Sequence, residues 1–208
     1  MNIEDQSTSG SSPSWLENIT RLFLGEPQDR EQLIELLCLA KERNLIDGET
    51  LSMMQGALLV SERRARDVMT PRPHLVVLHR DDDLDSVLRV VIDSLHSRIP
   101  VIGEDADEVV GILLPKDLLK WLHQEKREEF RLWDLLRKVL IVPDSMRLST
   151  LLKKLRISRN HMAIVVDEYG STAGVVTLED VLEQIVGEIE DEHDDPEELQ
   201  VTETGSQA

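Results

Sequence analysis

Thr177 and Asp180 are the residues whose types and spacing best suit ligand chemistry. They stand three positions apart in segment 174–180 (GVVTLED), where an apolar stretch gives way to a helical pattern. The free N–H groups and the dipole of a helix N-terminus favour an anion, so the Thr177 hydroxyl could help to hold a phosphate. The Asp180 carboxylate could accept hydrogen bonds from both hydroxyls of a ribose. Together the two residues could hold a nucleotide.

The same spacing also has a purely structural interpretation. A Thr at the N-cap, followed three residues later by an acidic residue, is the pattern of a capping box, in which each side chain bonds the other residue's backbone N–H. Both interpretations place Thr177 immediately before a helix. Spacing alone favours the capping box over ligand binding.

A second group of candidate ligand residues lies in segment 96–100 (HSRIP), together with Thr70. Arg98 can pair with phosphate oxygens, and His96 offers a ring for stacking. Ile99 and Pro100 would supply an apolar wall for adenine, and the backbone near Thr70 could meet the edge of the base. The alternative is a surface histidine and a solvated arginine. This group comprises Thr70, His96, Ser97, Arg98, Ile99 and Pro100.

Segment 111–117 (GILLPKD) repeats the first motif in a weaker form. Asp117 corresponds to Asp180, but Leu114 stands where a hydroxyl is needed. Asp117 could bind a ribose, or it could favour the helix dipole as an early acidic residue. We therefore rank a site at Asp117 below the site at Thr177 and Asp180.

No constellation typical of an enzyme occurs in the sequence. It has no His or Cys residues at metal-ligand spacing, no phosphate loop with Gly and Lys, and no Cys–His pair at a recognisable spacing. In the acidic stretch 188–198, eight of eleven residues are Asp or Glu. That stretch could hold a hard cation, but a solvated acidic run is the simpler interpretation. We expect a binding protein without catalytic residues or a metal centre.

Composition narrows the class of protein further. The net charge is −18, from 41 acidic and 23 basic residues, and this disfavours DNA or another nucleic acid as a partner, which requires a basic face. Aromatic residues make up only 3%, so the core must be aliphatic. Cys38 is the only cysteine and lies in an apolar run, which predicts a buried thiol. No stretch reaches the ~18 apolar residues of a membrane span, and the first residues do not resemble a secretory signal. We expect a cytoplasmic protein.

The elements that position these residues form an internal repeat. Segments 111–117 and 174–180 match at an offset of 174 − 111 = 63, which also aligns Val101 with Ile164 and Leu78 with Ile141 without a gap. In the first copy, strands are predicted at 75–78 and 109–113, a further strand ends near 103, and helices begin at 83 and 115. In the second copy, strands are predicted at 139–142 and 173–176, a further strand ends near 167, and helices begin at about 145 and at 178. This order predicts two α+β copies packed sheet to sheet.

Several motifs in the same order resemble the CorC/hemolysin-C group of magnesium and cobalt efflux proteins. They are FLGEP at 23–27, RDVMTPR at 66–72, HSRIPV at 96–101, HMAIVVDE at 161–168, GVVTLEDVLE at 174–183 and IVGEI at 185–189. The resemblance implies an α+β tandem CBS-domain pair (a Bateman module, named after cystathionine β-synthase) with an N-terminal helical leader. It also favours the ligand interpretation of Thr177 and Asp180. His161 resembles a position near the phosphates in some CBS pairs, and the alternative is a structural histidine.

The resemblance also implies a domain organisation. We expect disorder at 1–13, a helical leader at 14–62, CBS repeats at 67–124 and 130–190, and an acidic disordered tail at 191–208. Members of the group usually continue into a small C-terminal domain, whereas this sequence stops at Ala208.

Two functions are open at this point. The resemblance implies a regulatory homodimer that binds AMP, ADP or ATP, alone or with magnesium, and acts in magnesium and cobalt homeostasis. The apolar residues of the helices at 83–96 and 147–157 could serve the dimer or the chain's own core. The alternative is a scaffold that binds no nucleotide and docks a membrane transporter or a ribonucleoprotein. Either protein would act in the cytoplasm or at the inner face of the plasma membrane.

Overall fold

The computed structural model of the protein describes residues 27–105, 107–123 and 130–187. The chain divides into two compact units, residues 1–51 and 52–208, and each is taken by itself. The predicted disordered segments at 1–13 and 191–208 lie outside the described residues, as does the acidic stretch at 188–198.

Two helices occupy the described part of the predicted leader. Helix α2 (Arg30–Glu42) begins after Asp29, whose side chain accepts a hydrogen bond from the Gln32 N–H at 2.9 Å. No residue of α2 is buried, and Cys38 on this helix is only half-buried. The prediction of a buried Cys38 thiol is therefore wrong, because α2 contributes no side chain to a core among the described residues.

Helix α3 (Gly48–Val60) begins directly after Asp47. The Asp47 carboxylate accepts a hydrogen bond from the Thr50 N–H at 2.7 Å. This bond to the charged form lowers the pKa of the Asp47 carboxyl. The local sequence is therefore sufficient to start the helix.

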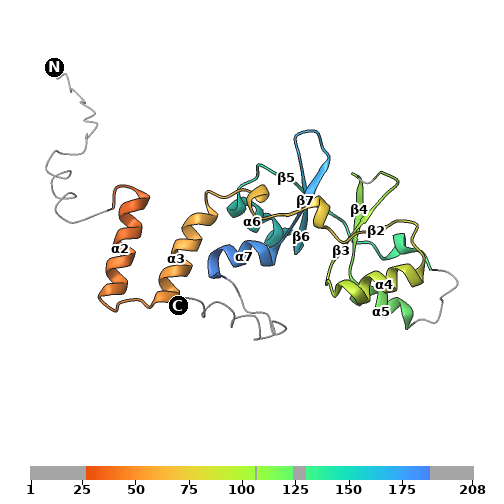
Figure 1. Cartoon of the computed structure of the whole chain (residues 1–208), viewed down its shortest axis with the longest axis horizontal. Coiled ribbons are helices and arrows are strands. Elements are labelled where there is room, and N and C mark those ends of the chain that lie inside the picture. The colour runs from red at the N-terminus through yellow and green to blue at the C-terminus, as the bar shows by residue number, and fades with distance from the viewer. Residues whose placement is uncertain (1–26, 106, 124–129, 188–208) are drawn as a thin grey trace, which may run out of the picture. The chain divides into compact units, whose positions relative to one another are not determined.

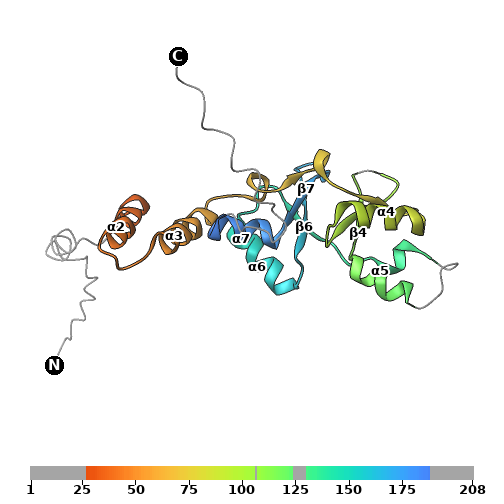
Figure 2. The same cartoon turned by 60° about the horizontal axis from the view of Figure 1, so that its bottom comes forward.

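The second unit contains two copies of one α+β arrangement, which can be followed in Figures 1 and 2. The first copy contains β2 (Leu78–His79), α4 (Leu84–Ser94), β3 (Ile99–Ile102), β4 (Val109–Leu113) and α5 (Pro115–Leu122). The second contains β5 (Leu140–Pro143), α6 (Leu148–Ser158), β6 (Met162–Val166), β7 (Thr172–Thr177) and α7 (Leu178–Val186). The predicted order of elements is confirmed in both copies.

Local signals placed most helix starts correctly. Asp83 caps α4 by accepting a hydrogen bond from the Ser86 N–H at 2.9 Å, and Pro115 opens α5 at the position where a missing N–H is tolerated. Helix α6 begins at Leu148 rather than near 145, because residues 144–146 form a turn in which the Met146 N–H bonds the Pro143 carbonyl.

The segments that lead into each copy cross to the other copy. Strand β1 (Thr70–Pro71) precedes the first copy but pairs with β7, so the second sheet has the order β1-β7-β6-β5, whereas the first sheet has the order β2-β3-β4. The segment before the second copy bridges back, because Arg137 pairs with Ile112 of β4 through bonds of 2.9 and 3.1 Å. This exchange ties the two sheets together.

A glycine stands at each crossing. A Cβ at Gly174 would collide with the Thr70 carbonyl oxygen, and a Cβ at Gly111 would collide with the Leu136 side chain. Each glycine therefore admits the segment that crosses its strand, and the predicted equivalence of Gly111 and Gly174 is confirmed.

The gap-free offset of 63 is wrong for the first half of each copy. Val101 pairs with both Leu78 and Gly111, whereas Val165 pairs with Val142 and Gly174. Val101 therefore corresponds to Val165, at an offset of 165 − 101 = 64, and not to Ile164. Likewise Leu78 corresponds to Val142 and not to Ile141.

The extra residue lies in the turn after β3. Six residues separate Ile102 from Val109, but only five separate Val166 from Thr172. Helices α4 and α6 begin 148 − 84 = 64 residues apart, whereas α5 and α7 begin 178 − 115 = 63 residues apart. Turns at the surface accept such insertions, whereas a slip of one residue within a strand would turn its core side chains to the opposite face.

The core has three parts, which confirm packing of sheet against sheet. One cluster fills the first copy around Val87, Val101 and Leu118, and another fills the second copy around Leu151 and Val165. A third lies between the sheets and consists of Ile112, Met162, Ile164 and Val175. Ile164 therefore faces the other copy, in agreement with the corrected register.

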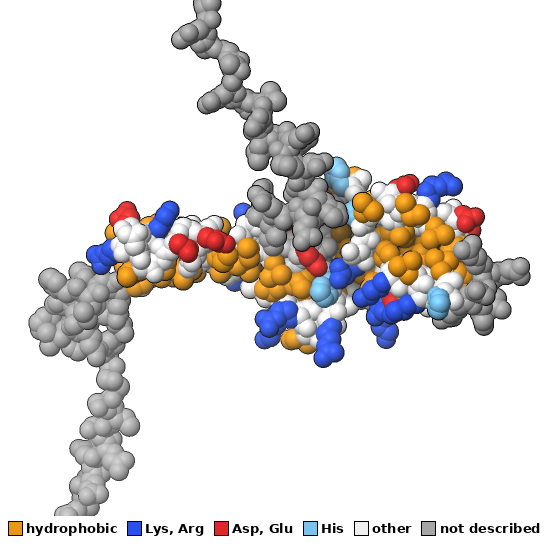
Figure 3. Space-filling view, turned by 90° about the horizontal axis from the view of Figure 1, so that it is seen from below, with side chains coloured by type: hydrophobic (Ala, Val, Ile, Leu, Met, Phe, Trp, Pro, Cys, Tyr) orange, Lys and Arg blue, Asp and Glu red, His pale blue; other side chains and the backbone are white. Residues whose placement is uncertain are grey.

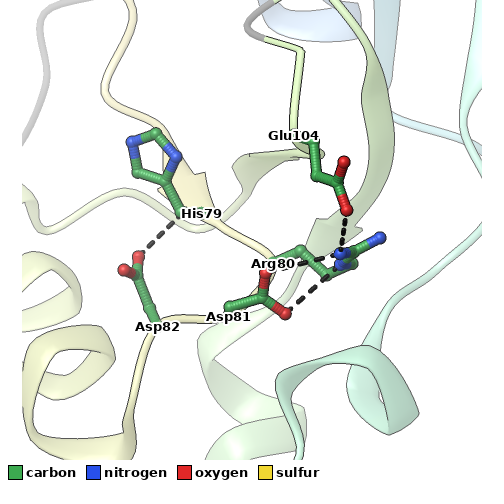
Figure 4. A network of polar contacts seen from close by, with 5 residues as sticks. All are labelled: His79, Arg80, Asp81, Asp82 and Glu104. Atoms are coloured by element: carbon green, nitrogen blue, oxygen red, sulfur yellow. Dashed lines mark hydrogen bonds and ion pairs between the residues drawn. The ribbon is translucent and has the colours of Figure 1, made fainter.

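Two polar networks hold the turns around these sheets. Arg80 bonds Asp81 at 3.3 Å and Glu104 at 3.2 Å (Figure 4), and these carboxylates raise the pKa of its guanidinium. The longer turn after β3 clamps the second copy, because the buried Thr172 hydroxyl donates to the Asp107 carbonyl oxygen at 2.8 Å. The Asp107 carboxylate also forms an ion pair with Arg72.

Candidate functional site

A hollow of about 420 Å³ collects most of the predicted ligand residues. Its lining comes from both copies and consists of Thr70, His74, Leu75, Val76, His96, Ser97, Arg98, Pro100, Met162, Val175, Thr177 and Glu179. Six of the nine predicted ligand residues lie there: Thr70, His96, Ser97, Arg98, Pro100 and Thr177. We call this hollow the first pocket.

Three local features bring these side chains together. Strand β1 carries Thr70 to a position beside Val175 of β7. Helix α4 ends at Leu95, whose left-handed φ of 56° turns the chain into segment 96–98 ahead of β3. Thr177 ends β7 and caps α7. The crossing of the lead-in segment thus places residues from both copies around one hollow.

The structure does not bring Ile99 to the pocket. Its side chain is fully buried in the core of the first copy, while Pro100 next to it lines the pocket. Successive residues of a strand point to opposite faces, so Ile99 and Pro100 cannot both form the expected wall.

Thr177 and Asp180 form the capping box that the sequence offered as an alternative. The Thr177 N–H donates to Asp180 Oδ2 at 2.7 Å, and the Asp180 N–H donates to Thr177 Oγ1 at 3.0 Å. Asp180 is not among the residues that line the pocket. The Thr177 hydroxyl only accepts in this arrangement, so its own hydrogen remains able to bind a ligand.

Asp117 lies away from the first pocket and already has cationic partners. Nε and Nη2 of Arg137 both lie 2.8 Å from Asp117 Oδ2, and Lys120 Nζ lies 3.5 Å from Oδ1. Burial raises the pKa of the Asp117 carboxyl, but the hydrogen bonds and charges of Arg137 and Lys120 outweigh it and leave the pKa lowered. This carboxylate is therefore engaged within the chain.

Six lining residues were not predicted from the sequence: His74, Leu75, Val76, Met162, Val175 and Glu179. Leu75 and Val76 were assigned to a strand, but β2 contains only Leu78 and His79, and the residues before it reach the pocket instead. Glu179 Oε1 lies 3.7 Å from Arg98 Nη1 and 3.3 Å from His161 Nδ1. The contact with Arg98 joins the two copies, whereas His161 belongs to the same copy as Glu179. Neither contact is predicted by a local sequence pattern.

The arrangement suits a ligand with a flat apolar part and an anionic end. Leu75, Val76, Met162 and Val175 supply apolar surface, while Arg98 and the Thr177 hydroxyl supply hydrogen-bond donors. The described residues contain no cluster of three or more His, Cys, Asp or Glu side chains that could hold a metal ion. Within the same residues, no helix is both long and apolar enough to cross a membrane.

The fold and the pocket define a protein with a tandem pair of CBS domains. The CBS-domain family model matches residues 65–124 and 133–187, and a second model, for the N-terminal region of NMB0537, matches residues 25–60.

Comparison with curated proteins defines the family more narrowly. The magnesium and cobalt efflux protein CorC of Vibrio cholerae is 44% identical over 201 residues, which cover 95% of this chain and 69% of that protein. CorC of Pasteurella multocida is 49% identical, over 85% of this chain and 59% of that protein. CorC of Escherichia coli K12 is 44% identical, over 87% of this chain and 62% of that protein. The chain belongs to the CorC family of magnesium and cobalt efflux proteins.

Solved structures show the same fold. A conserved domain of unknown function from Neisseria meningitidis MC58 has a TM-score of 0.68 at 46% identity, over 73% of this chain and 97% of that one. The CBS domain of a bacterial CNNM/CorC family Mg²⁺ transporter in complex with ATP has a TM-score of 0.63 at 40% identity, over 66% of this chain and 97% of that one. A CBS-domain pair from Klebsiella pneumoniae with bound AMP has a TM-score of 0.54 at 31% identity, over 60% of this chain and 98% of that one.

Proposed function

We propose that this chain is a regulatory module that binds an adenine nucleotide in the first pocket. The observation that carries the proposal is the convergence of Thr70, segment 96–98, Pro100 and Thr177 from both copies on one hollow. The relatives with bound ATP and AMP support the ligand class.

Each part of a nucleotide has a matching wall in the pocket. The apolar residues Leu75, Val76, Met162 and Val175 suit the faces of an adenine ring. Arg98 suits phosphate oxygens because its planar guanidinium presents several donors. The Thr177 hydroxyl can donate to a phosphate while it still accepts from the Asp180 N–H.

Asp180 is our candidate for the ribose contact. Its Oδ2 serves the capping box, which leaves Oδ1 to accept from a ribose hydroxyl after a modest movement. Asp117 in the other copy is a weaker candidate, because Arg137 and Lys120 already bind it and Leu114 offers no hydroxyl.

The regulatory role follows from the position of the pocket between the two copies. A nucleotide that binds one arrangement of the copies more tightly than another shifts the population toward that arrangement. In a CorC-family chain we assign this shift to magnesium and cobalt homeostasis, through a membrane transporter as partner. We place the chain in the cytoplasm, at the inner face of the plasma membrane, and we expect magnesium to accompany ADP or ATP.

We also propose a homodimer that uses helix surfaces of both copies. The apolar residues that suggested the helices at 83–96 and 147–157 serve the chain's own core, since Val87, Leu151 and Leu155 are fully buried. Other apolar side chains remain exposed, and Figure 3 shows hydrophobic residues gathered over the first copy, at the right. The exposed ones on α4 to α7 are Ile92, Leu119, Ile157, Leu182 and Val186, and Leu95 directly after α4 is exposed as well. Light scattering should give the mass of two chains, and a monomer at all concentrations would exclude the dimer.

Calorimetric titration with AMP, ADP and ATP, each with and without magnesium, tests the proposed function. We expect at least one nucleotide to bind saturably with one site per chain. Arg98→Ala should weaken that binding, whereas Arg89→Ala, which removes an exposed charge from α4 outside the first pocket, should not. Absence of binding by all three nucleotides to the folded protein would exclude the proposal and would favour the scaffold.

A further inference from the structure

Helix α6 carries an exposed basic surface on a strongly acidic chain. Residues 147–159 contain five cations and no Asp or Glu. We call these five residues the basic face of α6: Arg147, Lys153, Lys154, Arg156 and Arg159. All five are exposed, and within the residues that the structure describes none of them forms an ion pair.

The helix dipole accounts for only part of this face. Cations are favoured in the last turn of a helix, which suits Arg156 and Arg159. Arg147 is the N-cap residue, where the same dipole disfavours a cation, and Lys153 lies in the middle of the helix, where the dipole has little effect. An anion that covers the basic face must therefore extend along the whole of α6.

The charge on the rest of the chain limits which anion reaches this face. Without the five cations the net charge would be −18 − 5 = −23, so the remaining residues repel a nucleic acid or an anionic membrane as it approaches. An acidic segment of the same chain is held nearby at an effective concentration of about millimolar. The overall charge therefore favours a partner within the chain.

Helix α7 delivers such a segment to the start of α6. Arg63 joins the two helices, because its Nη1 donates to Gln184 Oε1 on α7 and its carbonyl accepts from the Leu148 N–H at 2.9 Å. Gly187 ends α7, and segment 188–198 follows, with eight acidic residues among eleven. Helix α6 is about 16 Å long, whereas eleven extended residues span about 36 Å. The acidic segment is therefore long enough to reach every cation of the basic face.

We propose that the acidic segment 188–198 docks on the basic face of α6 in the same chain. Each pair between exposed charges is weak, so the docking depends on several pairs together and is reversible. It is also sensitive to salt, because salt screens charges at the surface. None of the five cations lines the first pocket, so this inference does not depend on nucleotide binding.

Zero-length cross-linking of the full chain without nucleotide tests the contact. A water-soluble carbodiimide joins a carboxylate to a lysine that touches it, and mass spectrometry identifies the joined peptides. We expect segment 188–198 to be joined to Lys153 and Lys154 at about 0.02 M salt, and the yield to fall about fivefold or more at about 1 M salt. Lys116 and Lys138 are exposed lysines outside α6 and serve as internal controls, which should be joined to this segment far less.

A double charge reversal tests the same contact without a reagent. In Lys153→Glu with Lys154→Glu, the amide NMR signals of segment 188–198 should move to the positions that they have in the wild type at high salt. The control Lys116→Glu with Lys138→Glu changes the net charge equally and should leave these signals at their wild-type positions. Melting curves verify that both variants are folded.

Three results would overturn the inference. The first is a wild type in which Lys153 and Lys154 are not joined to the segment, or are joined no more than Lys116 and Lys138. The second comes from a mixture of isotope-labelled and unlabelled chains: joined peptides that combine the two forms would show that a second copy is the occupant. The third is the absence of these cross-links together with vesicles of phosphatidylserine that bind the wild type but not Lys153→Glu with Lys154→Glu, which would assign the basic face to a membrane.

Discussion

Gly174→Ala should destabilise the fold and also open the first pocket. Gly174 lies on β7 opposite Pro71, where β1 crosses from the lead-in of the first copy. A Cβ there would collide with the backbone carbonyl of Thr70. Backbone cannot rotate away as a side chain can, so β1 must move, and Thr70 must leave the wall of the pocket with it.

The expected cost follows from what the added methyl meets. Overpacking in a close contact costs about 1–3 kcal/mol, and displacement of β1 adds the loss of ladder hydrogen bonds at about 1 kcal/mol each. Replacement of Gly by Ala also stabilises the fold by about 0.4–1 kcal/mol, because Ala lowers the conformational entropy of the unfolded chain. We therefore expect a net loss of about 2–3 kcal/mol in the free energy of unfolding.

Gly111→Ala is the matched variant at the other crossing. The Cβ added there would lie 2.7 Å from Leu136 Cβ, which a change of rotamer does not move, so we expect a similar loss of about 1–3 kcal/mol. Leu136 does not line the first pocket, so nucleotide affinity should not change. Urea denaturation followed by circular dichroism measures both variants, and calorimetry measures nucleotide affinity. Unchanged stability or unchanged nucleotide affinity in Gly174→Ala, or an equal loss of affinity in Gly111→Ala, would refute the reasoning about the crossing of β1.

Three further substitutions test the site and its frame. Asp180→Ala should weaken nucleotide binding about ten- to a hundredfold, the effect of losing a charged hydrogen bond, and more than Asp117→Ala; wild-type affinity in both folded variants would refute the ribose assignment. Thr177→Val should weaken the binding of AMP more than that of adenosine, as measured by calorimetry. It should also lower stability by about 1 kcal/mol through the lost helix cap, which melting curves measure. An equal effect on the binding of both ligands would refute a contact between Thr177 and the phosphate. Thr172→Val should cost about 1–3 kcal/mol in urea denaturation, because it leaves the Asp107 carbonyl without its buried donor. The exposed control Thr150→Val should change the free energy of unfolding little. A similar loss of stability in both variants would refute a stabilising role for the hydrogen bond from Thr172 to Asp107.

Some of the site is visible from the sequence because it depends on local chemistry. Segment 96–98 lies next to the end of α4, and Thr177 lies where a strand pattern meets a helical one. The spacing of Thr177 and Asp180 predicted a helix start, and the two residues form the capping box. Residues such as His74 and Met162 could not be predicted, because they reach the pocket only through the crossing of β1 and the pairing of β6 with β7.

The sequence by itself determined the order of elements and most helix starts, since Asp83, Pro115 and Thr177 act through bonds within one turn of the chain. Only the tertiary structure decided the register of the repeat. Ile164 and Val165 are both apolar, so a slip of one residue leaves no trace in the pattern, whereas pairing with Gly174 places Val165 in the core and Ile164 between the sheets. Register and crossing arise from contacts between distant segments, which a local pattern does not encode.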